Sequence, residues 1–424
     1  MTSQLARRIA FTLGALLVYR LGTYIPVPGI DLAAWAQIFK SESGGILAEA
    51  NRLSSGAIAR LSIFSISIVP YLTAAMFVQL ALMVSRRLRA IRDQGEHGRR
   101  RLERSTRIVT VVLAAFQSYG IAGGLEGVRG VVVEPGPLFT LTTVATLTAG
   151  VLFLVWLAEQ ITARGIGNGL ALILFVGIAL ELPREIANTM EFVRMGVLSP
   201  VAALGLVALA IVVIGSIAVM ERARRLLPVR FAERDVGGRK IAAQTAEIAY
   251  KLNPAGILPM TITALTLTVA FIAFSLVFFV LGLDHIGPRL GALIGALSPG
   301  TPVHLALTAA LILFFVFVYT AFVCDPTDAA ETLKTHGGVI THNGVIADVT
   351  PGEPTAAYLD GVVTRTAVIG AVYLVVVILL PEILQMAIPV VPFAIGGIPM
   401  LILVCVTLDI EAQVRGELAR PVPA

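Results

Sequence analysis

The stretch VAALGLVALAIVVIGSIAVM, residues 201–220, decides the class of fold. It contains no charged side chain, and Arg222, Arg224 and Arg225 follow it within a few residues. A helix needs about 20 apolar residues to cross the roughly 30 Å of hydrocarbon in a bilayer. This stretch is therefore predicted to be a membrane-spanning helix that ends at a charged interface.

The composition of the whole chain supports the same class of protein. Of its 424 residues, 57% are hydrophobic and 14% are charged, and the mean hydropathy is +0.87. An ordinary soluble domain has about 25% charged residues, so this chain has too little charge to cover the surfaces of several soluble domains. Ten membrane spans are predicted, at residues 9–26, 63–83, 108–124, 138–158, 168–183, 201–220, 255–282, 303–323, 363–385 and 391–408.

The basic residues predict how the spans are oriented. Nine arginines lie between Arg86 and Arg107, and a second basic group lies between Arg222 and Lys251, whereas the loops on the other side carry few. Lysine and arginine are enriched in the cytoplasmic loops of membrane proteins. Both basic loops and both chain termini are therefore predicted to be cytoplasmic, which agrees with an even number of spans.

Two further features concern the organisation of the chain. Five spans precede and five follow the loop at 184–200, which predicts two halves, 1–190 and 191–424, as in membrane folds built from inverted repeats. Residues 46–62 are compatible with a helix but too polar to span the membrane. A surface amphipathic helix and a segment folded back into the protein fit this stretch about equally well.

Few residues point to catalysis or to a cofactor. Cys324 and Cys405 are too few for a disulfide framework, and the five histidines show no paired spacing typical of a metal site. The spans contain no paired carboxylates and no Ser–His couple, which argues against an intramembrane enzyme. They also hold almost no ionisable side chains, which argues against a secondary transporter. No catalytic residue, metal or cofactor is predicted.

Six short motifs accompany the predicted spans. They are YIPVPGID at 24–31, LSIF at 61–64 with PYLTA at 70–74, GEHGRR at 95–100, EQITARGIGNG at 159–169, YTAFV at 319–323, and GG at 396–397 with Asp409 and AQV at 412–414. In this order and spacing they resemble the SecY family, the channel-forming subunit of the bacterial protein translocase. The glycine-rich part of the fourth motif is predicted to be a tight turn into the fifth span, because no Lys-Ser/Thr follows to make a P-loop.

The resemblance implies a fold. SecY proteins are all-α polytopic membrane proteins whose ten transmembrane helices form a clamshell of two pseudo-symmetric halves around a pore, with a short plug helix. By resemblance the plug falls on residues 46–62. A hydrophobic ring that excludes ions by dewetting narrows the pore. Its members by resemblance are Ile68, Leu72, Leu174, Thr261 and Ile402. Thr261 departs from the aliphatic pattern, and a slip of one residue would place Ile262 there instead.

The resemblance also implies a function and partners. SecY proteins conduct unfolded preproteins across the bacterial cytoplasmic (inner) membrane and release transmembrane segments laterally into lipid. The lateral gate lies between the second and seventh spans, with Thr73, Gln79 and Asn253 as its polar residues. SecE and SecG are the expected partner subunits.

The long loops 221–252 and 324–362 are expected to dock the SecA motor or the ribosome. Basic residues there would contact ribosomal RNA through its phosphates, although positive-inside topology explains their charge equally well. These residues are Arg225, Arg230, Arg234, Arg239 and Lys240. In the second loop, Thr350 occupies the position where family members carry an arginine that matters for motor-driven export. Thr350 and Thr261 leave an alternative within the family, a specialised or accessory paralogue with altered SecA coupling.

Overall fold

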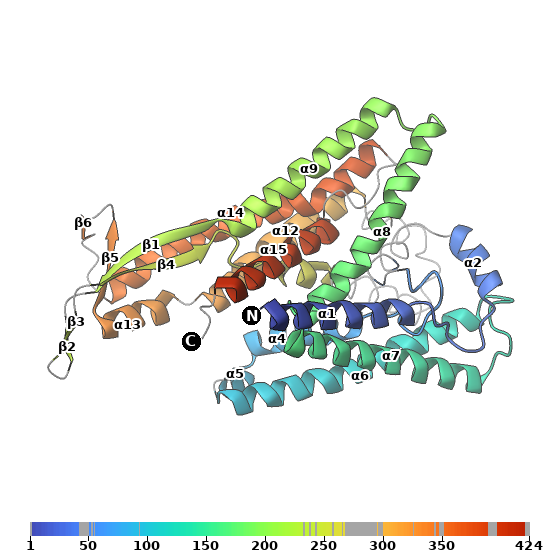
Figure 1. The fold of residues 1–424 in the computed structure, drawn as a ribbon, viewed down its shortest axis with the longest axis horizontal. Helices are drawn as coiled ribbons and strands as arrows, with labels where there is room; N and C mark the ends of the chain where they lie inside the picture. Colours follow the sequence, from blue (N-terminus) through green and yellow to red (C-terminus); the bar gives the residue numbers. More distant parts are fainter. Residues whose placement is uncertain are drawn as a thin grey trace, which may run out of the picture. The chain divides into compact units, whose positions relative to one another are not determined.

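The computed structural model shows a mainly helical protein whose described strands form a four-stranded sheet and a two-stranded sheet (Figure 1). The structure describes residues 2–41, 51, 54, 56–92, 94–231, 234–236, 239–241, 244–256, 258–264, 266–267, 295, 300–324, 326–342, 345–346, 352–388 and 397–419. The chain forms two compact units, one made of Met1–Ser199 with Ile402–Ala424 and the other of Pro200–Leu401.

The first unit is a bundle of long helices. Its elements are α1 (Thr2–Gly22), α2 (Leu32–Ser41), α4 (Val69–Val84), α5 (Arg86–Arg92), α6 (Glu96–Glu126), α7 (Pro137–Arg164), α8 (Gly169–Arg194) and most of α15 (Gly397–Ala419). Proline opens α7, where a missing backbone N–H costs nothing. Asn168 caps α8, because its side-chain oxygen accepts from the backbone N–H of Leu170 at 3.0 Å. α6 packs against α7 and α4 around a core that includes Ala114, Leu147 and Val151.

The second unit combines helices with strands. Its helices are α9 (Pro200–Arg222), α12 (Pro302–Val323), α13 (Pro326–His336), α14 (Glu353–Ala387) and the start of α15, and residues 258–264 are helical as well. The strands are β1 (Arg224–Phe231), β2 (Arg234–Val236), β3 (Arg239–Ile241), β4 (Gln244–Lys251), β5 (Gly338–His342) and β6 (Val345–Ile346).

The strands join the two long loops that the sequence marks for partner docking. β1 pairs antiparallel with β4 on one side and with β5 on the other, so the sheet has the order β4-β1-β5-β6. Leu227 and Val229 of β1 pack with Leu333 of α13 and Leu359 of α14 in a buried cluster. The mainly helical architecture predicted from sequence is confirmed, but the sheet was not predicted.

The described part of the chain contains six helices that are long and apolar enough to cross a membrane: α6, α7, α9, α12, α14 and α15. α4 and α5 would count as a seventh span if they act together, although they meet at an angle of 109°. The predicted total of ten stays a prediction. Residues 268–282 and 391–396, which belong to two predicted spans, lie outside the described residues. The predicted span at 63–83 begins too early, since its helix α4 starts at Val69 and residues 63–68 form turns.

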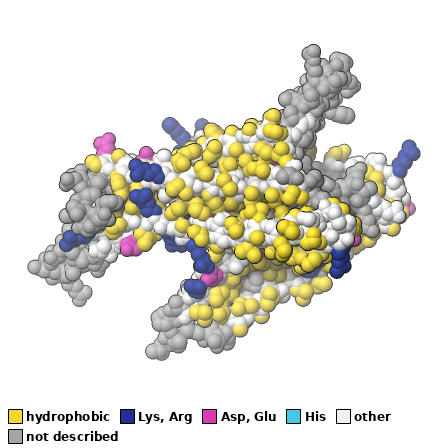
Figure 2. All heavy atoms as spheres, turned by 90° about the horizontal axis from the view of Figure 1, so that it is seen from above, with side chains coloured by type: hydrophobic (Ala, Val, Ile, Leu, Met, Phe, Trp, Pro, Cys, Tyr) yellow, Lys and Arg dark blue, Asp and Glu magenta, His cyan; other side chains and the backbone are white. Residues whose placement is uncertain are grey.

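The surfaces of these helices suit contact with hydrocarbon. On α9, Val201, Leu204 and Ile211 are 79%, 71% and 65% exposed. Figure 2 shows hydrophobic side chains gathered over broad areas, with lysine and arginine side chains mostly outside them. A protein in water rarely exposes contiguous apolar patches larger than a few hundred Å², so these faces agree with a membrane location.

Candidate functional site

A non-helical segment is buried inside the helices of the first unit. Residues 56–68, called the folded-in segment below, run through turns from the end of the predicted plug to the start of α4. The backbone N–H of Val27 donates to the carbonyl of Leu61 at 2.8 Å, and that of Ile63 donates to Ile25 at 2.9 Å. These bonds flank an antiparallel bridge between Pro26 and Ser62, so the chain after α1 and the folded-in segment are paired.

Burial decides between the two interpretations of this part of the chain. Ala57 and Ser62 are completely buried, and Ser54 and Leu61 nearly so. A surface amphipathic helix would keep one face in contact with solvent or headgroups. The described residues between 54 and 62 are therefore folded into the protein, and they form turns where a helix was predicted. Residues 46–50, 52, 53 and 55 of the predicted plug lie outside the described residues.

Side chains satisfy many of the backbone groups that this burial removes from solvent. The Trp35 indole N–H donates to the carbonyl of Ile58 at 3.0 Å, and the Asn51 side-chain oxygen accepts from the N–H of Ala59 at 2.8 Å. The Ser65 hydroxyl donates to the carbonyl of Ala57 at 3.1 Å. Buried backbone groups without partners are costly, so these bonds allow irregular backbone among the helices.

Glycines on two helices let the folded-in segment approach closely. A Cβ added at Gly150 of α7 would collide with the carbonyl oxygen of Ile63, and one at Gly22 of α1 would collide with the ring of Phe64. That ring stacks on Phe153 of α7 with centroids 5.9 Å apart and planes 8° apart. The sequence offers no periodic signal for these contacts, because they join positions far apart in the chain.

The structure places the predicted ring residues in different environments. Ile68 directly precedes α4 and is completely buried, and Ile402 of α15 is nearly so. Leu72 and Leu174 are partly exposed within the first unit. Thr261 belongs to the second unit, where its hydroxyl donates to the carbonyl of Leu258 at 2.8 Å. The constriction itself stays a prediction.

The predicted gate residues also divide between the units. Thr73 is buried in α4 and Gln79 is partly exposed further along that helix. Asn253 is buried and ordered by its own unit, because its side-chain amide donates to Glu221 Oε1 at 2.9 Å while its oxygen accepts from the N–H of Gly256 at 3.1 Å. The bond to Glu221 ties the chain after β4 to the end of α9, a role that sequence reasoning missed.

The predicted docking arginines and the lysine lie on three strands. Arg225 and Arg230 are on β1, Arg234 is on β2, and Arg239 and Lys240 are on β3. β2 and β3 form a hairpin in which Arg234 is opposite Ile241. The hairpin therefore holds three of the five basic positions, Arg234, Arg239 and Lys240, whereas Arg225 and Arg230 belong to the four-stranded sheet. Thr350 lies outside the described residues.

The predicted turn between two spans is confirmed. α7 ends at Arg164 and α8 begins at Gly169. Thr12 of α1 accepts the N–H of Ile166 at 3.0 Å, and Gln413 of α15 accepts the N–H of Gly167 at 2.8 Å. The turn thus links four helices of the first unit.

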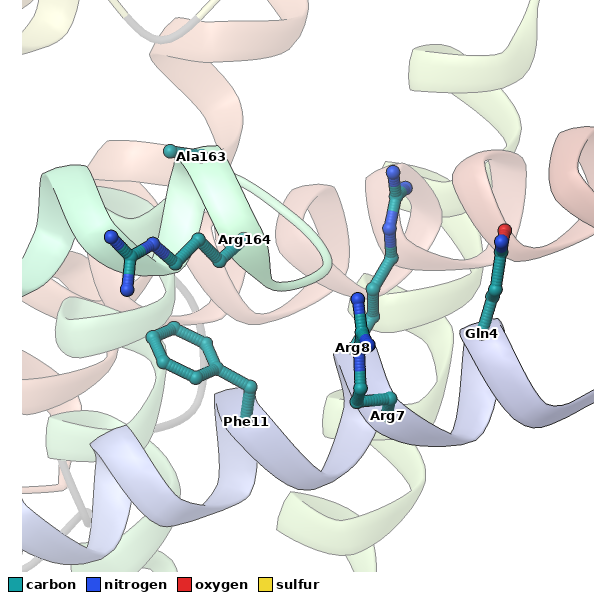
Figure 3. A pocket seen from close by; sticks show the side chains of 6 residues that line it. All are labelled: Gln4, Arg7, Arg8, Phe11, Ala163 and Arg164. Carbon is teal, nitrogen blue, oxygen red and sulfur yellow. The ribbon is translucent and has the colours of Figure 1, made fainter.

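A shallow hollow of about 510 Å³ lies near this turn, between the start of α1 and the end of α7 (Figure 3). Arg8 pairs with Glu417 at 2.9 Å, and the Arg164 side chain extends beside the ring of Phe11. Among the described side chains, those that line the hollow include no carboxylate, hydroxyl or thiol. Its lining residues are Gln4, Arg7, Arg8, Phe11, Ala163 and Arg164.

The apolar helices surround a buried segment that does not span the membrane. Together they indicate a polytopic membrane protein that holds irregular backbone among its helices. A sequence model described as SecY matches residues 62–411. The protein translocase subunit SecY of Escherichia coli K12 is 40% identical over 421 residues, which cover 97% of this chain and 91% of that protein. The chain belongs to the SecY family.

Solved structures share the fold at 14% sequence identity, and each match covers 98% of this chain and 93% of the other. One, described as the structure of a protein conducting channel, has a TM-score of 0.65. A second concerns the SecY plug domain, said to stabilise the closed state of the channel and to maintain a membrane seal, with a TM-score of 0.61. A third is Sec61 in a canine ribosome–channel complex, with a TM-score of 0.62.

Proposed function

We propose that this chain is the central channel subunit of a Sec protein translocase. It conducts unfolded preproteins across the cytoplasmic membrane of a bacterium and releases transmembrane segments laterally into lipid. The observation that carries the proposal is 40% identity to a SecY translocase subunit over 97% of the chain. Membership of this family makes the chain a channel and not an enzyme, and it sets aside the secondary transporter.

The folded-in segment supports a plug for this channel. It is irregular and buried, and it is held largely by hydrogen bonds to backbone groups. Such bonds can be exchanged for other partners when a polypeptide enters. We assign the plug to residues 46–62 on this basis, with residues 63–68 of the folded-in segment as its link to α4.

The pore ring is assigned to Ile68, Leu72, Leu174, Thr261 and Ile402. Burial supports Thr261 over its neighbour, because Ile262 is 1% exposed, whereas Thr261 is partly exposed. The Thr261 hydroxyl is already bonded within its helix, so it adds less polarity than a free hydroxyl would. A narrow apolar constriction of this kind resists wetting by ions.

The lateral gate is assigned to the seam between α4 and the helix that begins at 258. Thr73, Gln79 and Asn253 supply its polar side chains. Interhelical hydrogen bonds in membranes contribute about 0.6–2 kcal/mol each, which suits a seam that opens. Asn253 also holds the end of α9, so its substitution would disturb the gate and the loop together.

Partners are assigned by family and by charge. The basic positions on β1, β2 and β3 suit an anionic partner surface such as ribosomal RNA or SecA, and one similar structure is a ribosome–channel complex. SecE and SecG are the proposed small subunits, and both termini are placed in the cytoplasm. Because Thr350 replaces an arginine, an accessory paralogue with altered SecA coupling is the second candidate.

Complementation of SecY-depleted bacterial cells tests the proposal. Full rescue supports a housekeeping channel and contradicts the specialised paralogue, whereas growth rescued only by Thr350→Arg supports altered coupling. In parallel, a stalled secretory chain is tested for crosslinks to Ile68→Cys and Ile402→Cys. The matched control is Val112→Cys, on an exposed face of α6. Crosslinks at neither pore position would refute the conducting role.

A further inference from the structure

Arg60 makes a contact unlike the others in the folded-in segment. It is the one ionisable residue in 56–68. Its Nε donates to the carbonyl of Thr23 at 3.0 Å, and its guanidinium carbon lies 4.4 Å from the centre of the Tyr24 ring. Both partners belong to the chain that follows α1, so Arg60 joins two segments that are 37 residues apart.

The Tyr24 ring is shared between two cations. The Arg20 guanidinium carbon lies 5.0 Å from the same ring centre, and its Nη2 donates to the tyrosine hydroxyl at 3.0 Å. A guanidinium over an aromatic face gains about 0.5–2 kcal/mol, more when water is excluded. Two like charges at one ring repel each other, however, and this limits how firmly Arg60 is held.

One acidic group offsets that repulsion. A Cβ added at Gly56 would lie 3.0 Å from Arg60 Nη2 and 3.0 Å from Glu181 Oε1. The guanidinium of Arg60 and the carboxylate of Glu181 are therefore neighbours on either side of Gly56. Glu181 is on α8 and its side chain is 14% exposed. Burial, and next the charge of Arg20, lower the pKa of Arg60 from its ordinary value. Gly56 has a φ of +73°, and its missing side chain leaves room for both groups.

We propose that Arg60 is the positioning residue that holds the folded-in segment in its closed place, through the Thr23 carbonyl and the Tyr24 ring. The proposal rests on the proposed function, in which this segment belongs to the plug. The other hydrogen bonds described for the segment come from neutral groups, and several of them, such as those of Ser62 and Ser65, join the segment to itself. Beside the backbone bonds at Val27 and Ile63, Arg60 adds a charged tie to the chain after α1. Because Arg20 repels Arg60, this tie is a point of release.

Ion leak through the resting channel tests this role. The full chain is reconstituted in vesicles with SecE and SecG, and chloride efflux is measured without preprotein. Loss of a hydrogen bond from a charged donor corresponds to a change of roughly 10- to 100-fold in the population of the open state. Arg60→Gln and Tyr24→Leu should raise the leak by about this factor, and Tyr24→Phe should raise it less. The leak of Arg60→Lys should lie between that of the unaltered chain and that of Arg60→Gln.

A matched control and a lock separate positioning from misfolding. Arg100→Gln removes an arginine of α6 whose side chain is 78% exposed, and it should leave the leak unchanged. Pro26 and Ser62 are bridge partners flanked by two backbone hydrogen bonds. In such a pair the two α-carbons lie about 4.5 Å apart, a distance that a disulfide between cysteines at these positions can span. Oxidised Pro26→Cys/Ser62→Cys should therefore abolish the leak of Arg60→Gln, and reduction should restore it.

The outcomes distinguish the two proposals. An Arg60→Gln leak equal to that of the unaltered chain overturns the positioning role. The role is also overturned if Arg60→Gln still leaks after Pro26→Cys and Ser62→Cys have been oxidised to a disulfide. Preprotein transport by the unaltered chain is measured in the same vesicles with SecA and ATP. Its absence overturns the proposed function, whereas transport together with an unchanged Arg60→Gln leak overturns the positioning role alone.

Discussion

Gly150→Ala is expected to destabilise the protein although alanine favours helices. In α7, replacement of glycine by alanine alone would stabilise by about 1 kcal/mol or less. Here the new Cβ would overlap the carbonyl oxygen of Ile63 and lie 3.1 Å from its carbonyl carbon and 3.4 Å from Phe64 Cδ1. The obstacle is backbone, so no side-chain rotation relieves it. Overpacking of this kind costs about 1–3 kcal/mol, and we expect a net loss of about 1–2 kcal/mol.

Thermal unfolding in detergent at a fixed scan rate is the assay, because such midpoints depend on the scan rate. Gly120→Ala in α6 is the matched control, since nothing lies within 4 Å of the Cβ that it adds. It should raise the midpoint while Gly150→Ala lowers it, and the Gly150 variant should also leak ions because the folded-in segment is displaced. A midpoint for Gly150→Ala at or above that of the unaltered protein would refute the close packing of α7 against Ile63.

Two further substitutions probe other contacts. Thr12→Val removes the oxygen that accepts the N–H of Ile166, and a buried donor without a partner costs about 1–3 kcal/mol. The unfolding midpoint should fall, Thr12→Ser should retain most of the stability, and equal midpoints for valine and threonine would contradict the linkage. Thr261→Ile makes the proposed ring fully aliphatic, so the resting conductance in planar bilayers should fall by a few-fold. A larger change from Ile262→Thr than from Thr261→Ile would instead assign the ring position to Ile262.

The sequence was sufficient for the helices that hydropathy can detect. The stretch at 201–220 is α9 within two residues at either end, and the motif at 159–169 marks the turn between α7 and α8. Both follow from local properties, which are apolar length in one case and glycine spacing in the other.

Features that depend on distant parts of the chain were missed. Residues 63–68 are apolar enough to extend a span, but Ser67 has a φ of +55°, which no hydropathy window detects. β1 contains Pro228, a residue usually excluded from central strands, and its neighbour β5 lies more than 100 residues further along. The contact of Arg60 with Tyr24 likewise joins residues whose proximity exists only after the first unit has folded.

The pairing of β1 with β5 has a mechanical consequence. Val229 is opposite Ile340 and Phe231 is opposite Gly338, so paired strands join the two long loops. A push on either loop is transmitted to α9, which leads into β1, and to α13 and α14, which pack beneath the sheet. A partner that pushed on these paired strands would therefore act on several helices of the second unit at once.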